Sequence, residues 1–326
     1  MNHTTLPKVL SINIVKARVD GKPGKRAQLV LNTGECQYAA ERRREKRKAC
    51  EFCAFHDQKP SEHGIPFGDA IHMATNVARV DAIELLMSGG SLLDQRQVAK
   101  EQLGELLGLI PQSQIRTVLL ESRPEFITNE SLLFVLRHLT TVQNPHQPMN
   151  LEVAIGVETY DDHIRCEELG KGFAFNKFLA AAGQITANGA TPVAYLLTGL
   201  PMFDETSARH DLFRAAMKID EFSRLFGQLI PGYRYPTSSP VRICIESFFP
   251  VEGVTTLAAG SYLTPAFVAG VVRGIMEKFG LEIYIATSSE NTGAQHPLTE
   301  FKQLFERFNE SQDIRHLDAI IRGRAE

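Results

Sequence analysis

The sequence predicts an α/β fold in which buried strands alternate with helices, closed into a full or partial TIM-like barrel of the (β/α)6 type. Short apolar runs recur along the 326 residues, and helical patterns separate them. Continuous runs of β-branched and aliphatic residues are typical of parallel strands buried on both faces. A doubly wound open sheet is the alternative. The runs lie at 27–32, 82–87, 115–120, 151–157, 192–199, 241–247 and 281–287.

Helix-end signals support this alternation. After the third run, residues 129–142 predict a helix with Asn129 as its N-cap. Residues 172–189 predict a helix that ends at the Asn188-Gly189 stop. We expect a barrel over 1–289, including the lead-in and the cysteine loop, and a short helical cap over 290–326 packed on it.

Composition excludes several classes of protein. Hydrophobic residues make up 43% of the chain and the formal net charge is −3, so no general basic field attracts nucleic acid or an acidic membrane. Five cysteines, an odd number, argue against a secreted disulfide framework and favour the reducing cytoplasm. No stretch reaches the roughly 20 apolar residues that span a bilayer. The oligomeric state stays open.

Three cysteines fall in one short segment. Cys36 follows the first run directly, and thirteen residues separate it from the pair Cys50-x-x-Cys53. Two thiolates on one tight turn can reach a common metal, and a third can join them if the loop folds back. A zinc site, with His56 or His63 as fourth ligand, is a rival interpretation, as is a redox pair of Cys50 and Cys53.

Polar and turn residues follow six successive runs. Examples are SGGSLLD after the second, ESRPEF after the third and ETYDD after the fourth. Ordinary turns also contain Gly, Pro and Asp. Because the carboxyl ends of parallel strands meet at one edge, this repetition favours a shared mouth.

The cysteine loop and these segments together resemble the radical S-adenosylmethionine (SAM) superfamily. Phe52, inside the Cys50–Cys53 pair, matches the aromatic residue that lies near the adenine of SAM. The thirteen-residue gap is longer than the usual three. SGGSLLD, ESRPEFIT, GVETYDD with GKGF, and the late SQDI look like the branch that contains the archaeosine synthase radical subunit (RaSEA), related more distantly to the elongator catalytic subunit.

The resemblance implies roles for individual residues. It implies that Cys36, Cys50 and Cys53 bind a four-iron four-sulfur cluster whose open position takes SAM. The residues it implies as SAM contacts are Phe52, Ser88, Gly89, Gly90, Glu121, Arg123, Glu158, Gly199, Leu200 and Pro201. Glu246 and Tyr38 are candidates to contact substrate. Simple packing of Tyr38, a Glu121–Arg123 ion pair and a Glu246–Arg242 ion pair are the structural alternatives.

The activity implied is reductive cleavage of SAM to a 5′-deoxyadenosyl radical that abstracts hydrogen from a substrate. We expect a small-molecule or metabolite substrate, because no basic RNA-binding module is visible, with archaeosine-type tRNA base modification as the alternative. A zinc-stabilised binding protein without catalysis is a third interpretation.

The basic run ERRREKRK lies between Cys36 and Cys50. It is either a solvated helix face or a surface for an anionic substrate or for an acidic electron donor such as flavodoxin or ferredoxin.

Overall fold

The chain divides into two compact units. Residues 1–47, 55–155 and 184–191 form the first, and residues 48–54, 156–183 and 192–326 form the second. The computed structural model describes residues 6–50, 52–53, 63–111, 114–139, 149–229, 241–248, 260, 262–287 and 298–324.

The first unit is a sheet covered by helices. Strand β1 (Val9–Val19) pairs antiparallel with β2 (Lys22–Leu31), which pairs in parallel with β3 (Ala82–Met87). Strand β4 (Thr117–Glu121) and then β5 (Asn150–Glu158) continue the sheet in parallel. Every residue of β3 is buried, as expected for a parallel strand covered on both faces. The last residues of β5 belong to the second unit.

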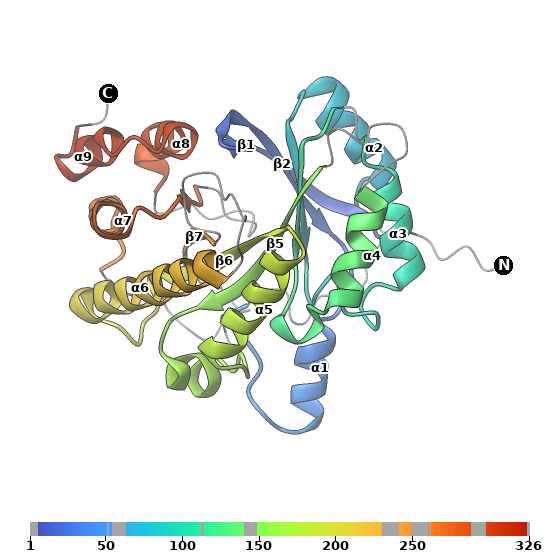
Figure 1. Ribbon diagram of the computed structural model, residues 1–326, viewed down its shortest axis with the longest axis horizontal. Helices are drawn as coiled ribbons and strands as arrows, with labels where there is room; N and C mark the ends of the chain where they lie inside the picture. Colours follow the sequence, from blue (N-terminus) through green and yellow to red (C-terminus); the bar gives the residue numbers. More distant parts are fainter. Residues whose placement is uncertain are drawn as a thin grey trace. The chain divides into compact units, whose positions relative to one another are not determined.

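The helices of the first unit follow the strands. Helices α3 and α4 pack side by side (Figure 1). The unit's helical elements are α1 (Gln37–Arg44), α2 (Phe67–His72), the π-helical turn η1 (Met73–Val77), α3 (Lys100–Gly108), the 3-10 turn η2 (Pro124–Phe126) and α4 (Asn129–Leu139).

The second unit repeats the βα pattern. Strands β6 (Thr191–Thr198), β7 (Arg242–Ser247) and β8 (Ile283–Ile285) pair in parallel. Helix α5 begins in this unit and ends in the first, and α7 contacts both α6 and α9. The unit's helical elements are the π-helical turn η3 (Ile164–Glu168), α5 (Phe175–Ala187), α6 (Glu205–Leu229), α7 (Pro265–Phe279), the 3-10 turn η4 (Thr299–Phe301), α8 (Lys302–Ser311) and α9 (Arg315–Ile321).

Strand order confirms the predicted fold class. The sheet runs from β1 to β8 in chain order, which is the order of a partial α/β barrel. Each of the seven apolar runs overlaps one of the strands β2 to β8. Helix α8 covers the edge of β8, because the Asn309 side chain bonds both the N–H and the C=O of Ile285, at 2.9 and 2.8 Å. The domain boundary at 289/290 stays a prediction.

Two local expectations had different outcomes. Helix α5 ends before Gly189, which has a positive φ, as predicted. Asn129, however, is not the N-cap of α4. Thr128 takes that role, because its Oγ1 accepts the N–H of Ser131 at 3.1 Å and its carbonyl accepts the N–H of Leu132 at 3.0 Å.

In the described part of the chain, none of the helices combines the length and apolar character that a membrane crossing needs.

A buried ion cluster joins four strands of the first unit. The Arg26 guanidinium on β2 contacts Glu84 on β3 at 3.1 Å and Glu152 on β5 at 2.7 Å, and it donates two hydrogen bonds to the Arg18 carbonyl on β1. Burial alone would lower the pKa of Arg26, but the attraction of both carboxylates raises it overall. The guanidinium is therefore charged and fully engaged.

Breaking this cluster should be costly. Glu152→Ala removes the carboxylate that takes two of the Arg26 hydrogen bonds and leaves a buried charge partly unpaired. We expect a loss of about 3–5 kcal/mol in the free energy of unfolding, measured by urea denaturation. Glu105→Gln, at an exposed position on α3, is the matched control. A loss below about 1 kcal/mol would show that the cluster does not stabilise the sheet.

Candidate functional site

In the first unit, Cys36 lies at the start of helix α1. It is the N-cap residue, its carbonyl accepts the N–H of Ala40 at 3.0 Å, and its side chain is largely buried. The neighbouring backbone is held by Gln97, a residue that sequence reasoning did not select. The Gln97 amide donates to the Thr33 carbonyl at 2.7 Å and accepts the N–H of Gln37 at 3.0 Å. One side chain therefore fixes both sides of Cys36.

The same glutamine packs against the predicted glycine loop after β3. A Cβ added to Gly90 would lie 2.4 Å from the Gln97 Oε1, and Gly90 has a positive φ of 92°, so only glycine fits there. Ser88 Oγ accepts the N–H of Thr33 at 3.2 Å, and the Gly89 carbonyl accepts the Thr33 hydroxyl at 3.0 Å. The Cys36 loop and the Ser88–Gly90 loop therefore form one hydrogen-bonded assembly.

The next strand exit brings predicted residues together in another way. The Arg123 guanidinium stacks on the Tyr38 ring, with 3.6 Å between its carbon and the ring centroid. Its side chain also pairs with Glu125, and its N–H donates to Ser91 Oγ at 2.9 Å. Glu121 Oε2 accepts the N–H of Met87 at 2.9 Å. A contact between Tyr38 and Arg123 was not anticipated, because the two belong to different motifs.

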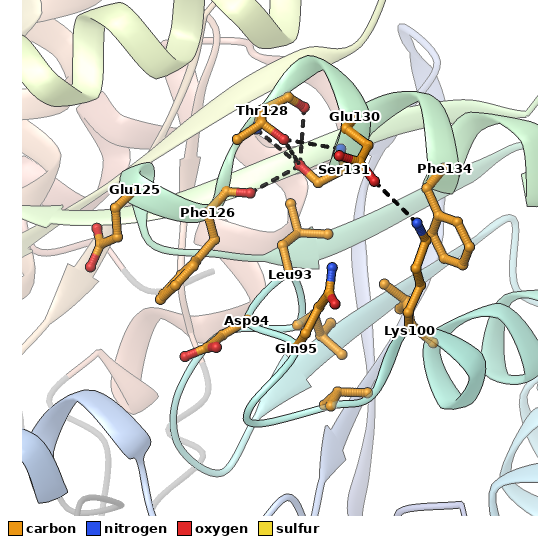
Figure 2. A pocket seen from close by; sticks show the side chains of 13 residues that line it. Leu93, Asp94, Gln95, Lys100, Glu125, Phe126, Thr128, Glu130, Ser131 and Phe134 are labelled. Carbon is orange, nitrogen blue, oxygen red and sulfur yellow. Dashed lines mark hydrogen bonds and ion pairs between the residues drawn. The ribbon is translucent and has the colours of Figure 1, made fainter.

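A pocket of about 320 Å³ opens beside the same strand exits (Figure 2). Phe126 and Phe134 lie on two sides of it, and Lys100 pairs with Glu130 across its rim at 3.2 Å. Glu125 lines it, whereas the described lining includes none of the predicted SAM contacts. The pocket is thus separate from the predicted SAM contacts.

In the second unit, Cys50 and Cys53 lie on one tight turn. The N–H of Cys53 donates to the Cys50 carbonyl at 2.8 Å, and both side chains are half-buried and in no disulfide. Phe52, between them, packs on an apolar cluster that contains Leu169, Leu197, Leu200 and Phe248. The pair therefore lies on a turn held by a backbone hydrogen bond and by the packing of Phe52.

Glu158 lies at the end of β5 in an uncommon conformation. Its φ is 68°, which few residues other than glycine adopt, and its side chain is buried. The carboxylate forms an ion pair with Lys171, whose ammonium lies 5.2 Å from the centroid of the Phe52 ring. Two predicted SAM contacts, Phe52 and Glu158, are thus joined by the lysine of the GKGF segment, to which the sequence analysis gave no role.

The β6 exit carries the remaining predicted SAM contacts. The N–H of Gly199 donates to the Tyr262 hydroxyl at 3.0 Å, and that hydroxyl donates to the Leu200 carbonyl at 3.2 Å. Leu200 is fully buried and shares the apolar cluster of Phe52, whereas Pro201 is exposed. The predicted substrate contact Glu246 is half-buried on β7, opposite Leu197.

Comparison with known proteins shows what the chain as a whole is similar to. No protein-family model matches the chain. It is 31% identical over 131 residues to archaeosine synthase subunit beta of Methanosarcina acetivorans, covering 40% of this chain and 36% of that one. It is 23% identical over 214 residues to the Thermococcus kodakarensis subunit, covering 64% and 62%. The chain thus spans less than two thirds of either relative.

A solved structure provides the comparison for the fold. HydG, a maturase of the [FeFe]-hydrogenase, aligns with 87% of this chain and 55% of its own at a TM-score of 0.55 and 10% identity. The chain has the radical SAM superfamily fold. It is also a distant homologue of archaeosine synthase subunit beta. The superfamily expected from Phe52 and the strand-exit segments is confirmed at the level of fold.

The predicted cluster ligands of this radical SAM fold divide between the units. Cys36 belongs to the first unit, and Cys50 and Cys53 belong to the second. Among the described residues, no three His, Cys, Asp or Glu side chains gather as a metal site. Cysteine thiolates are the donors that iron–sulfur clusters use, so Cys36, Cys50 and Cys53 fit the group chemically. The ligand set stays a prediction. His56 lies outside the described residues, and His63 is exposed.

Gln97 offers a test of the Cys36 loop. Gln97→Leu leaves the Thr33 carbonyl and the Gln37 N–H without their side-chain partner. We expect a loss of about 1–3 kcal/mol in the free energy of unfolding in urea. Gln95→Leu, at an exposed position on the same loop, should change it by less than about 0.5 kcal/mol. Equal effects of the two substitutions would contradict this role of Gln97.

Tyr262 offers a test by pH. Burial raises its pKa to about 12, although the hydrogen bond from Gly199 lowers it somewhat. The stability contributed is fully present below the unfolded pKa of about 10 and is lost as the pH rises toward 12. Tyr262→Phe lacks this dependence, so its deficit in unfolding free energy should shrink between pH 9 and pH 12. A deficit that stays constant over that range in urea titrations would refute the shift.

Proposed function

We propose that this protein is a radical SAM enzyme in which Cys36, Cys50 and Cys53 hold a four-iron four-sulfur cluster. The observation that carries the proposal is the assembly around the Cys50–Cys53 turn. Phe52 shares an apolar cluster with Leu200 and a cationic neighbour with Glu158. Three residues that the family resemblance relates to SAM are therefore gathered around one turn, although more than a hundred positions separate Phe52 from the other two.

The residues of the chain have separable tasks. A cluster with bound SAM would supply an electron that splits SAM and yields a carbon radical able to abstract hydrogen. Phe52, Leu200 and the Gly199 turn offer an apolar surface to the adenine, with Pro201 beside them. Glu158 offers a carboxylate to ribose hydroxyls or to the amine of methionine. In the first unit, Arg123 suits a carboxylate, and Ser88, Gly89 and Gly90 offer backbone groups.

For the substrate, we propose a small molecule or metabolite, contacted by Tyr38 and Glu246. The net charge of −3 supports this choice over a large polyanion. The homology to archaeosine synthase subunit beta favours a second candidate, modification of a base in tRNA. A gel shift with bulk tRNA across a salt series distinguishes them, because binding driven by phosphates weakens steeply with salt.

We also propose a cytoplasmic enzyme reduced by an acidic donor such as flavodoxin or ferredoxin. The odd cysteine count supports the compartment, and helix α1 supports the donor. Arg43 pairs with Glu35, and the side chains of Arg44, at the end of the helix, and Lys46, just beyond it, are exposed. This leaves positive charge at the C-terminal end of the helix that Cys36 caps.

The proposal that this protein is a radical SAM enzyme predicts a specific product. Anaerobically reconstituted protein should release 5′-deoxyadenosine from SAM when dithionite is added, and Cys36→Ala, Cys50→Ala and Cys53→Ala should each abolish that release. Cys244→Ala, at a buried position on β7 outside the proposed site, is the control and should retain it. Metal analysis that finds zinc instead of iron, together with no release of the nucleoside, would favour a zinc-stabilised binding protein.

A further inference from the structure

Lys171 has no role of its own in the proposed function. Its ammonium lies between the Glu158 carboxylate and the Phe52 ring, 5.2 Å from the ring centroid. The Lys171 side chain is 13% exposed and that of Glu158 is 6% exposed. A pair buried to this degree couples its partners tightly, because removal of one charge leaves the other uncompensated. Lys171 therefore constrains both of its neighbours.

The segment that carries Lys171 also supports the cysteine turn. Residues 164–171, the supporting segment, contact Lys48 and Phe52 at several points. Lys48 pairs with Glu168 at 3.6 Å, and Phe52 packs on Leu169. An added Cβ on Gly170 would lie 2.8 Å from the Lys48 carbonyl carbon, so the two backbones are in close contact. Lys171 adds a charged contact to the Phe52 ring.

The Glu158 backbone is held independently of Lys171. The buried Arg165 guanidinium donates to the carbonyls of Val157, Thr159 and Tyr160, at 3.1, 2.6 and 2.9 Å. These bonds flank Glu158 on both sides and can retain its left-handed conformation. A change at Lys171 should thus free the Glu158 carboxylate and the Phe52 ring while the β5 exit keeps its path.

We propose that Lys171 is a positioning residue that couples the Cys50–Cys53 turn to Glu158. Its charge fixes the Glu158 carboxylate, and its cation–π contact fixes the Phe52 ring, so that the two are presented to SAM together. The proposal rests on the proposed function for the identity of the ligand. The coupling itself is a property of the chain and can be measured without cluster or SAM.

The first measurement uses the fact that the chain contains no tryptophan. Phe52→Trp places a single indole on the turn, and acrylamide quenching of its fluorescence in the metal-free protein reports how firmly the turn is held. Adding Lys171→Met should raise the quenching constant about two- to threefold, because the turn opens more often. Adding Lys171→Arg should largely restore it. Lys177→Met, at an exposed position on α5, is the control and should leave it unchanged.

A double substitution covers the case in which Lys171→Met does not fold. Glu158→Gln with Lys171→Met removes both charges, which is better tolerated than removing one. In the Phe52→Trp background it should still raise quenching, because the cation is gone from the ring. Circular dichroism checks the fold of each variant. Quenching that stays at the level of the Lys177→Met control in either Lys171 variant would overturn the proposal.

The second measurement concerns SAM binding, with Phe52 intact. Lys171→Met should raise the SAM dissociation constant about tenfold by equilibrium dialysis while the protein still binds iron at the level of the unsubstituted chain, and Lys171→Arg should recover most of the affinity. An unchanged dissociation constant would overturn the coupling to SAM. If the unsubstituted chain binds neither iron nor SAM, the proposed function fails, whereas the quenching result still decides whether Lys171 holds the turn.

Discussion

The buried guanidinium of Arg26 sets the geometry on which the first unit depends. A charge without access to water must be neutralised, and Glu84 and Glu152 can do so only if β2, β3 and β5 keep one register. The same guanidinium also fixes the position of the β1–β2 hairpin, because its other N–H groups donate to the Arg18 carbonyl. The strand exits then have fixed places. The loops at Cys36, Gly90 and Arg123 are built on that frame.

Loop positions in both units depend on polar side chains that contact two segments at once. In the first unit, the Gln97 amide joins the backbone around Cys36 to the glycine loop. In the second, Lys171 joins Glu158 to Phe52. A loop has few internal hydrogen bonds of its own, so a single well-placed donor can decide its conformation. The proposed cluster and SAM sites therefore owe their order to residues outside the cysteine motif.

Much of the fold could be predicted because parallel strands have a strong sequence signature. Runs such as 82–87 and 151–157 are apolar except for one glutamate each and a glycine in the second, and each coincides with most or all of an observed strand. Strand β1 was missed because its exposed face interrupts the apolar pattern. A signal was nevertheless present: Asp20 and Gly21, both with positive φ, form the two-residue turn that joins it to β2. Because Asp-Gly is typical of two-residue hairpin turns, it predicts a strand on each side of it, here β1 and β2.

The candidate site was less predictable, for a physical reason. Cys36, Phe52 and Glu158 could be singled out from their motifs, whereas Gln97 lies in no motif and Lys171, although part of the GKGF segment, acts through contacts with residues distant in sequence that no local pattern encodes. The stacking of Arg123 on Tyr38 is of the same kind. Glu121 and Arg123 were correctly placed at one strand exit, but the structure also gives each a local task, Glu121 at the Met87 N–H and Arg123 at Glu125.

The central claim is that three cysteines hold a cluster to which SAM binds directly. Electron paramagnetic resonance of the dithionite-reduced, anaerobically reconstituted protein tests it most directly. We expect the signal of a reduced four-iron four-sulfur cluster whose line shape changes when SAM is added, since SAM would occupy the iron left open by Cys36, Cys50 and Cys53. A cluster signal that is indifferent to saturating SAM, or no cluster signal at all, would contradict the account.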